Sequence, residues 1–541
     1  MKRQQCWIKE CKASVHRGTA LMALETENED SVEPVEKKEK LTSVLLLVTL
    51  VSTIGSSFQY GYNVASVNSP SPFMQNFYNE TYLDHYGSLL SKDLETILWS
   101  LTVSLYPLGG FFGSLLVGPM VNKIGRKGTL LVNNIFSIVP AILMGTSVLA
   151  KSFEVIIASR LVIGICAGLS SNVVPMYLGE MSPKNLRGAI GVMPQLLITI
   201  GILMAQIFGI RVILGNSDGW PILLALTGIP AVMQMMLLPF FPESPRYTLL
   251  QKGKEGEAKK ALQRLRGCDD VDNEIKEMYQ EDQSEKAEGR LSVGNLCTFR
   301  PLRWQLISII IMNMGQQLSG INAVYYYADT IYAQAGVPDE TVQYVTVATG
   351  SVNVLMTLAA IFIVDSWGRR LLLLLGFGIC CTACVVLTIA LVYQTTVHWM
   401  PYLSIACVII YVIGHAIGPS PIPYVITTEM FRQASRPAAF MVAGSVHWLS
   451  NFTVGLIFEF LRKGLGSYCF ILFAAICLAT FLFIFFVVPE TKGKTFLEIS
   501  QLMAKRNGLD EITDSKEIMD LNPSLKDTTL EKSDIAFNTP L

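Results

Sequence analysis

Long apolar runs recur along the chain and alternate with short polar stretches. A helix needs about 20 mainly apolar residues to cross a bilayer, and twelve runs reach this length. The chain is therefore predicted to be an all-α polytopic membrane protein. The predicted spans are 43–63, 97–117, 129–149, 153–174, 190–210, 220–240, 304–325, 342–364, 371–392, 401–424, 438–460 and 467–488.

Composition agrees with a membrane protein. Of the 541 residues, 51% are hydrophobic and 16% are charged, whereas soluble domains carry about 25% charged residues. The 42 basic and 43 acidic residues nearly cancel, and no basic domain indicates nucleic-acid binding. Most of the 11 cysteines lie in apolar runs, which favours reduced structural thiols over a disulfide scaffold.

The positions of Lys and Arg predict which side the termini occupy. With both termini in the cytoplasm, 36 of the 42 basic residues fall on that side, as the positive-inside rule expects. The loop near 64–95 is then outside. It carries the sequon Asn79-Glu80-Thr81, so we predict a glycosylation site at Asn79.

The polar segments divide the chain into two halves. The middle segment mixes Lys, Arg, Glu and Asp at helix-compatible spacing, which predicts a solvated helical linker. The terminal Thr539-Pro540-Leu541 weakly matches a PDZ-type contact. The predicted parts are the cytoplasmic N-tail 1–40, a six-helix bundle at 41–241, the cytoplasmic linker 242–303, a second six-helix bundle at 304–490 and the cytoplasmic C-tail 491–541.

The two halves repeat each other in sequence. Gly125-Arg126 follows the second predicted span and Gly368-Arg369 follows the eighth, 243 positions later. Parallel six-helix repeats are typical of transporters with a substrate site near the midplane. A seven-helix receptor has too few spans, and the chain lacks the phosphate loop of an ATP-driven pump.

The repeated charges all fall at predicted inner helix ends. Their simplest interpretation is orientation by positive charge, but acids recur at the same places and orientation needs none. We therefore predict a cytoplasmic gate in which ion pairs tie the two halves together and open by exchange with water. The predicted gate consists of Arg126, Glu180, Arg187, Glu243, Asp365, Arg369, Arg370, Glu429, Arg436 and Glu490.

Neutral polar residues within the spans are the candidate substrate ligands. Buried polar groups in a membrane helix usually face a cavity or a partner helix, so each one alone could equally serve helix packing. Amides and imidazoles can both donate to and accept from the hydroxyls of a neutral polyol. No Asp or Glu lies near the middle of a span, which favours passive uniport over proton coupling. We expect no cofactor.

Several motifs together resemble the sugar porters of the major facilitator superfamily, and the resemblance spans about 41–500. It is nearest to animal facilitative hexose transporters and, among these, to the fructose branch. The first set of motifs is Gly125-Arg126-Lys127, Gly368-Arg369-Arg370, Pro242-Glu243-Ser244-Pro245-Arg246, Gln316-Gln317-Leu318-Ser319-Gly320-Ile321-Asn322 and Pro489-Glu490-Thr491-Lys492-Gly493. The branch is indicated by Met193-Pro194-Gln195, Gly414-His415-Ala416 and Ser445-Val446-His447-Trp448.

This resemblance implies a plasma-membrane hexose uniporter, not an enzyme, that carries fructose by alternating access, with glucose as a second candidate substrate. Asn63 stands where proton-linked relatives have Asp, Asn122 replaces a usual Asp, and Tyr424 is a larger selectivity wall than the fructose branch has. Two alternatives stay open: a urate or organic-anion carrier, and a sugar sensor that does not transport. The implied sugar-site residues are Tyr60, Gln195, Gln316, Gln317, Asn322, Asn353, His415, His447 and Trp448.

Overall fold

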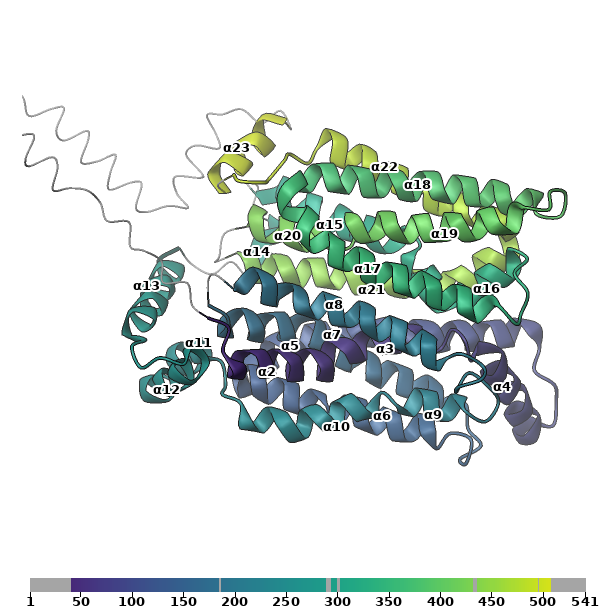
Figure 1. Ribbon diagram of the computed structural model, residues 1–541, viewed down its shortest axis with the longest axis horizontal. Helices are drawn as coiled ribbons and strands as arrows, with labels where there is room; N and C mark the ends of the chain where they lie inside the picture. Colours follow the sequence, from purple (N-terminus) through teal and green to yellow (C-terminus); the bar gives the residue numbers. More distant parts are fainter. Residues whose placement is uncertain are drawn as a thin grey trace, which may run out of the picture. The chain divides into compact units, whose positions relative to one another are not determined.

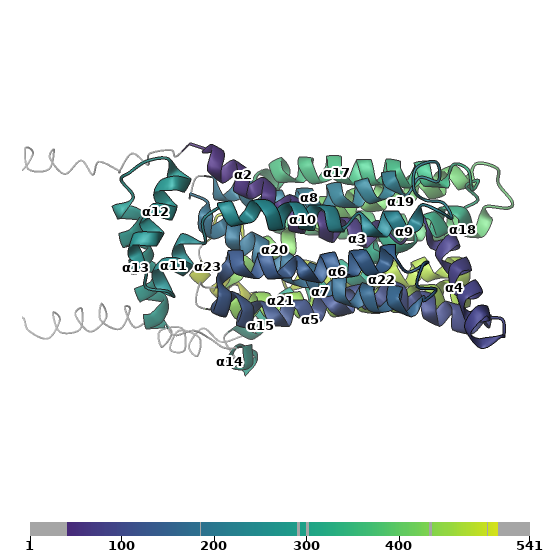
Figure 2. The same cartoon turned by 90° about the horizontal axis from the view of Figure 1, so that it is seen from below.

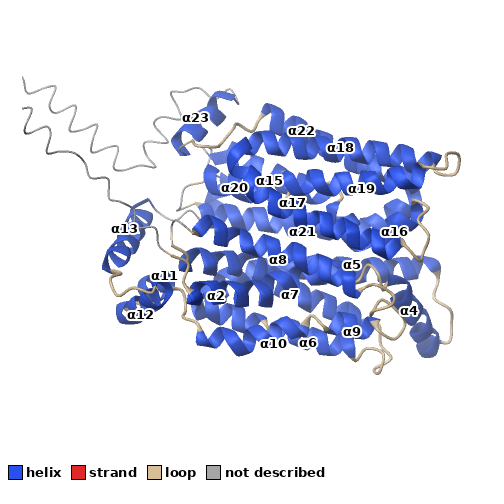
Figure 3. Ribbon diagram, in the orientation of Figure 1, coloured by secondary structure: helices blue, strands red, loops and turns tan. Residues whose placement is uncertain are grey.

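The computed structural model describes residues 40–183, 186–288, 293–298, 302–431, 435–494 and 496–506. Internal contacts separate Met1–Lys40 from Leu41–Leu541, and every described helix belongs to the second unit. The described residues of this unit form helices and loops without a strand (Figure 3). The predicted all-α class is confirmed.

The N-terminal half begins with a crossing interrupted by a π-helical turn. The half consists of α2 (Ser43–Ser52), η1 (Thr53–Phe58), α3 (Gln59–Ala65), α4 (Ser71–Tyr86), α5 (Lys92–Asn133), α6 (Ile135–Gly145), α7 (Glu154–Met181), α8 (Arg187–Phe208), α9 (Trp220–Ala225), α10 (Gly228–Leu237) and η2 (Leu238–Phe240). The linker contains α11 (Pro245–Leu250), α12 (Glu255–Arg266), α13 (Asp272–Glu288) and α14 (Val293–Thr298).

The C-terminal half contains two broken helices, each interrupted beside glycine. The half consists of α15 (Arg303–Leu318), α16 (Ile321–Gln334), α17 (Val342–Trp367), α18 (Arg369–Tyr393), α19 (Met400–Ile417), α20 (Ile422–Met430), α21 (Arg436–Leu465), η4 (Gly466–Tyr468) and α22 (Cys469–Phe486). A short helix comes next, α23 (Phe496–Arg506), which packs on α15 and α20.

Nine segments of the described chain are long and apolar enough to cross a membrane. Two of them, Lys92–Gly145 and Ala438–Phe486, have 54 and 49 residues. Each has the length for two crossings, since one crossing takes about 20 residues. The predicted count of twelve crossings and the predicted domain boundaries stay predictions.

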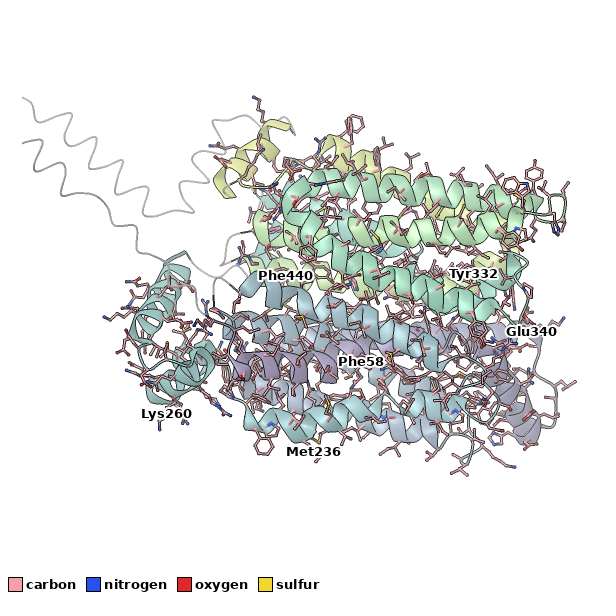
Figure 4. The ribbon with its side chains drawn as sticks, viewed as in Figure 1. Phe58, Met236, Lys260, Tyr332, Glu340 and Phe440 are labelled. Carbon is pink, nitrogen blue, oxygen red and sulfur yellow. The ribbon has the colours of Figure 1, made fainter. Side chains whose placement is uncertain are left out.

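The helices of the two halves lie on opposite sides of a common boundary (Figure 1). Across it, α5 packs against α21 and α8 packs against α17. The linker helices α11–α13 lie at one end of the bundle, called here the linker end, and α4 lies at the other, called the α4 end (Figures 1 and 2). Lys260 marks the linker end and Glu340 the α4 end in Figure 4.

Two features differ from the predicted spans. The outside loop 64–95 contains the helix α4, whose Met74, Tyr78 and Thr81 are buried. Their spacing is helical, but the segment is too polar to stand out among apolar runs. In addition, α5 continues through the predicted loop near 118–129 and has one non-helical residue, Gly125, with φ 81°.

Glycine lets α5 and α7 approach at backbone distance. A Cβ on Gly164 would lie 2.0 Å from the carbonyl oxygen of Tyr106, and one on Gly168 would lie 2.1 Å from that of Gly110. Small residues allow such close packing of membrane helices. This contact fixes the face of α5 that carries Tyr106 toward the boundary between the halves.

Candidate functional site

A chain of neutral polar groups runs through the C-terminal half. Nδ2 of Asn322 donates to Oε1 of Gln317 at 2.6 Å, and Nε2 of Gln317 lies 3.1 Å from Nδ1 of His447. The hydroxyl of Tyr424 lies 3.4 Å from the same His447 nitrogen. Three residues of the predicted sugar site, on α15, α16 and α21, are thus brought together. The predicted selectivity wall, Tyr424 of α20, lies beside His447.

A second polar group forms where the helix from α19 to α20 is broken. Gly418 leaves the helical conformation, and Pro419 and Pro421 lack backbone donors. The Ser420 carbonyl lies in this break and accepts a hydrogen bond from Nε2 of Gln316 at 2.9 Å. Nε2 of His415 lies 3.2 Å from the Gln316 carbonyl oxygen.

Gln195 joins this second group from the other half. Its Nε2 on α8 donates to Oγ of Ser420 at 3.4 Å. Oε1 of Gln316 is buried without a hydrogen-bond partner among the described residues. A buried acceptor without a partner is costly, so a hydroxyl group that reached this oxygen would be favoured.

Aromatic rings from both halves complete the site. Trp448 of α21 is 1% exposed, and its ring centroid lies 5.3 Å from that of Tyr60 and 6.4 Å from that of Tyr106. A Cβ on Gly110 would lie 2.3 Å from Cε3 of Trp448. The indole therefore packs directly on the N-terminal half, where glycine leaves room for it.

Asn353 lies apart from these groups in the contacts that the structure describes. Its Nδ2 donates to the hydroxyl of Tyr325 at 3.0 Å, so it joins α17 to α16. Sequence reasoning did not name Ser420, Tyr106 or Tyr325 as site residues, because hydroxyl and tyrosine side chains are common in membrane helices. Only Ser420 stood within a motif, Gly418-Pro419-Ser420-Pro421-Ile422-Pro423.

The repeated motif at Gly125 builds a cage around an acid. Because Gly125 has φ 81°, a conformation that favours glycine, the backbone N–H groups of Arg126 and Lys127 both donate to Oε1 of Glu243, at 3.1 and 2.9 Å. The Arg126 side chain pairs with Glu180 at 2.8 Å. The hydroxyl of Ser244 donates to Glu180 as well.

The C-terminal half repeats this cage. Gly368 has φ 89°, and the backbone N–H groups of Arg369 and Arg370 donate to Glu490 at 2.9 and 3.0 Å. The Arg369 side chain pairs with Glu429 at 3.0 Å, to which the Thr491 hydroxyl donates at 2.5 Å. The sequence repeat is therefore also a structural repeat.

These cages correct the predicted arrangement of the gate. The ion pairs Arg126–Glu180 and Arg369–Glu429 each join helices of the same half, whereas we expected the charges to tie the halves together. Side-chain reach explains this, because each acid lies near the end of a neighbouring helix of its own half, Glu180 on α7 and Glu429 on α20. Arg436 donates to the carbonyl oxygens of Thr428 and Phe431, and the side chains of Arg187 and Asp365 lie outside the described residues.

Comparison with known proteins fits this geometry. The model of the family described as "Sugar (and other) transporter" matches residues 48–503. The chain belongs to this family. It is therefore a multi-pass membrane transporter and not an enzyme, and the resemblance to sugar porters that its motifs indicated is confirmed.

Individual relatives cover most of the transporter. Human solute carrier family 2, facilitated glucose transporter member 5, is 66% identical over 481 residues, which are 89% of this chain and 96% of that protein. Human member 7 of the same family is 53% identical over 511 residues, which are 94% of this chain and 100% of that protein. The structure of the xylose transporter of E. coli in a partially occluded inward-open conformation shares the fold, with a TM-score of 0.71 and 24% identity over 84% of this chain and 100% of that one.

At the α4 end of the transporter, polar groups bond across the two halves. Nδ2 of Asn68 donates to Oδ1 of Asp329 at 2.9 Å, and the backbone N–H of Asp329 donates to Oδ1 of Asn68 at 3.0 Å. We call this reciprocal pair the Asn68–Asp329 clasp. Nearby, the Arg211 backbone N–H donates to Oε1 of Gln343 at 2.5 Å.

Also at the α4 end, the transporter has a small cavity of about 140 Å³ that residues of both halves line. The Lys463 ammonium donates to the Thr96 hydroxyl there, and Arg462 pairs with Glu459 at 2.5 Å. Asn79 lies close by on α4, and its Nδ2 donates to Oε1 of Glu95 at 3.1 Å. Glycosylation at Asn79 stays a prediction, and a glycan there would have to compete with this hydrogen bond.

Proposed function

We propose that the transporter is a facilitative hexose carrier of the plasma membrane that prefers fructose and carries glucose as a second substrate. The observation that carries this proposal is the neutral hydrogen-bonding group around Ser420, which receives Gln316 from one half and Gln195 from the other. Amides, imidazoles and hydroxyls suit the mixed donors and acceptors of a sugar. The aromatic rings of Tyr60 and Trp448 suit its apolar C–H face.

Passive uniport is part of the proposal. No acid lies near the middle of a predicted span, and proton-coupled carriers need an ionisable group within the membrane. Asn63 is a neutral amide whose Nδ2 donates to Oγ1 of Thr227 at 2.7 Å and to the Gln59 carbonyl at 2.8 Å. This position therefore has a structural partner and no proton to exchange.

The transport cycle we propose is alternating access between the two halves. The Asn68–Asp329 clasp supports it, because a bond that joins the halves at the α4 end can hold that end closed while the linker end separates. The bias of Lys and Arg toward the linker end indicates that this end is cytoplasmic. In the proposed cycle, sugar enters from outside when the clasp opens and leaves at the linker end when the clasp forms.

Uptake into proteoliposomes tests the proposal. The purified transporter is given labelled fructose, and unlabelled fructose, glucose and urate compete in separate arms. We expect saturable fructose uptake, weaker competition by glucose and none by urate. An imposed proton gradient should leave the final internal fructose equal to the external concentration, and accumulation above it would contradict uniport.

The urate arm also tests the organic-anion alternative. The predicted spans hold no cation near their middle, which argues against an anionic substrate. The structure, however, completely buries Arg160 on α7. Urate uptake without sugar uptake would make this alternative correct. Binding of sugar without any uptake would favour the sensor that does not transport.

A further inference from the structure

Arg160 is a buried cation that the proposed sugar site does not use directly. It lies six residues into α7, roughly 9 Å from the start of the helix, and is 0% exposed. Its Nε donates to the Thr102 carbonyl at 3.1 Å and its Nη1 to the Asn63 carbonyl at 3.0 Å. One guanidinium thus joins α3, α5 and α7.

The same guanidinium lies against the aromatic part of the site. Its Cζ is 4.6 Å from the centroid of the Tyr106 ring, within the range of a cation–π interaction. The Tyr106 hydroxyl donates to the Tyr60 carbonyl at 2.9 Å. The Tyr106 ring also meets Trp448 of the opposite half edge to face, so Arg160 is one contact away from both ring partners of the site.

The contacts of Arg160 require the planar guanidinium group, whose several N–H donors point in different fixed directions. Among the described residues it forms no ion pair with Asp or Glu, and its Nη2 is buried without a hydrogen-bond partner. Two carbonyl oxygens on different helices and one ring face surround it. Lysine has a compact ammonium group instead of a planar guanidinium, so it cannot contact both carbonyl oxygens and the Tyr106 ring at once.

We propose that Arg160 is a positioning residue for sugar recognition, which fixes Tyr106 and, through it, Tyr60 and Trp448. The inference rests on the proposed function, since it needs a sugar that meets these rings. Arg160 itself does not touch the sugar. Its effect should therefore appear in sugar affinity, and it should depend on Tyr106.

The test compares equilibrium fructose binding in the full-length transporter and its variants. Arg160→Lys should raise the Kd for fructose about tenfold and raise KM more than it lowers kcat. In a Tyr106→Phe background, which lacks the hydroxyl bond to Tyr60, the same change should raise Kd less than about threefold. Ser170→Ala is the matched control, because it removes a buried hydrogen bond between Ser170 on α7 and Asn133 and should leave Kd unchanged.

Three results would overturn the inference. A lower Tm with unchanged Kd in Arg160→Lys would make the residue merely structural, and an equal rise of Kd in both backgrounds would show that it does not act through Tyr106. If Arg160→Lys does not fold, Tyr106→Phe alone should still raise Kd several-fold, and an unchanged value contradicts the inference. A parent protein that binds neither fructose nor glucose would instead refute the proposed function, and this inference with it.

Discussion

At the linker end, the two described cage ion pairs join helices of the same half, whereas at the α4 end the Asn68–Asp329 clasp joins residues of opposite halves. The two ion pairs are Arg126–Glu180 and Arg369–Glu429. The difference indicates that the strong charge clusters make each half rigid, while weaker bonds close the passage.

The energies of the two kinds of contact fit these roles. A hydrogen bond contributes about 0.5–1.5 kcal/mol net, and one to a charged group about 1.5–3 kcal/mol. The clasp has few bonds, so thermal motion can break and remake it in each cycle. Each cage combines an ion pair with several charge-assisted hydrogen bonds, and breaking it would be too costly for a step that repeats.

Breaking a cage should have the largest effect. Gly368→Ala forces an ordinary residue into φ 89° and places a Cβ 2.8 Å from Oε2 of Glu490, so we expect a loss of about 2–4 kcal/mol in stability. Thermal unfolding in detergent measures it. Gly378→Ala is the control, because its Cβ would meet nothing nearer than 3.7 Å. Equal Tm values for the two variants would show that the cage contributes nothing.

Breaking the clasp should shift conformation rather than unfold the protein. Asn68→Asp places a second carboxylate against Asp329. We expect this to destabilise the state with a closed α4 end by about 1–3 kcal/mol relative to the open state, which lowers the ratio of closed to open molecules roughly 5- to 150-fold. Accessibility of cysteines at the α4 end to an impermeant reagent measures it. The exchanged pair Asn68→Asp with Asp329→Asn should restore closure, and failure to restore it would contradict the role of the clasp.

Gln195 tests the contact that lies between the two ends. Gln195→Ala removes the amide that reaches Ser420 across the boundary. We expect fructose binding to weaken by about 1–2 kcal/mol, or roughly 5- to 30-fold, with unchanged surface expression. His415→Ala should act in the same direction, because it removes the ring that supports the Gln316 carbonyl. Unchanged fructose affinity in both variants would remove these residues from the site.

Tyr424 should give the smallest effect. Its hydroxyl is 3.4 Å from Nδ1 of His447, a long and weak contact, and the side chain is 40% exposed. Tyr424→Phe should change uptake by less than about twofold, which corresponds to a few tenths of a kcal/mol. Tyr424→Ala should remove the ring, widen the sugar site and raise the ratio of fructose to glucose uptake. A lower ratio would show that the ring excludes glucose rather than admitting it.

The sequence predicted the fold and the residue types of the site better than it predicted which side chains bond to one another. Apolar runs directly reflect burial in lipid, so the spans could be found, and the repeat of Gly125 and Gly368 correctly marked two equivalent places. Pairing could not be found in the same way. Nothing in the order of residues says whether the acid nearest Arg126 belongs to its own half or to the other.

Other features left no pattern to find. The helix α4 is polar overall, and only three buried side chains mark its inner face. Tyr106 and Arg160 take their places through the glycine contact between α5 and α7. This contact is a property of the folded structure and leaves no pattern in the order of residues. The cross-half clasp joins residues 261 positions apart, and each of its members alone is an ordinary polar residue near a helix end.

Cross-linking the clasp tests the account most directly. The variant carries Asn68→Cys and Asp329→Cys, with the exposed Cys268 and Cys297 replaced by serine. The control pair Asn79→Cys with Glu95→Cys lies at the same end, where those residues bond within one half. We predict that oxidation of the clasp pair stops fructose uptake, that a reducing agent restores it, and that the control pair transports in both states. Full uptake by the cross-linked clasp variant would contradict alternating access through opening of the α4 end.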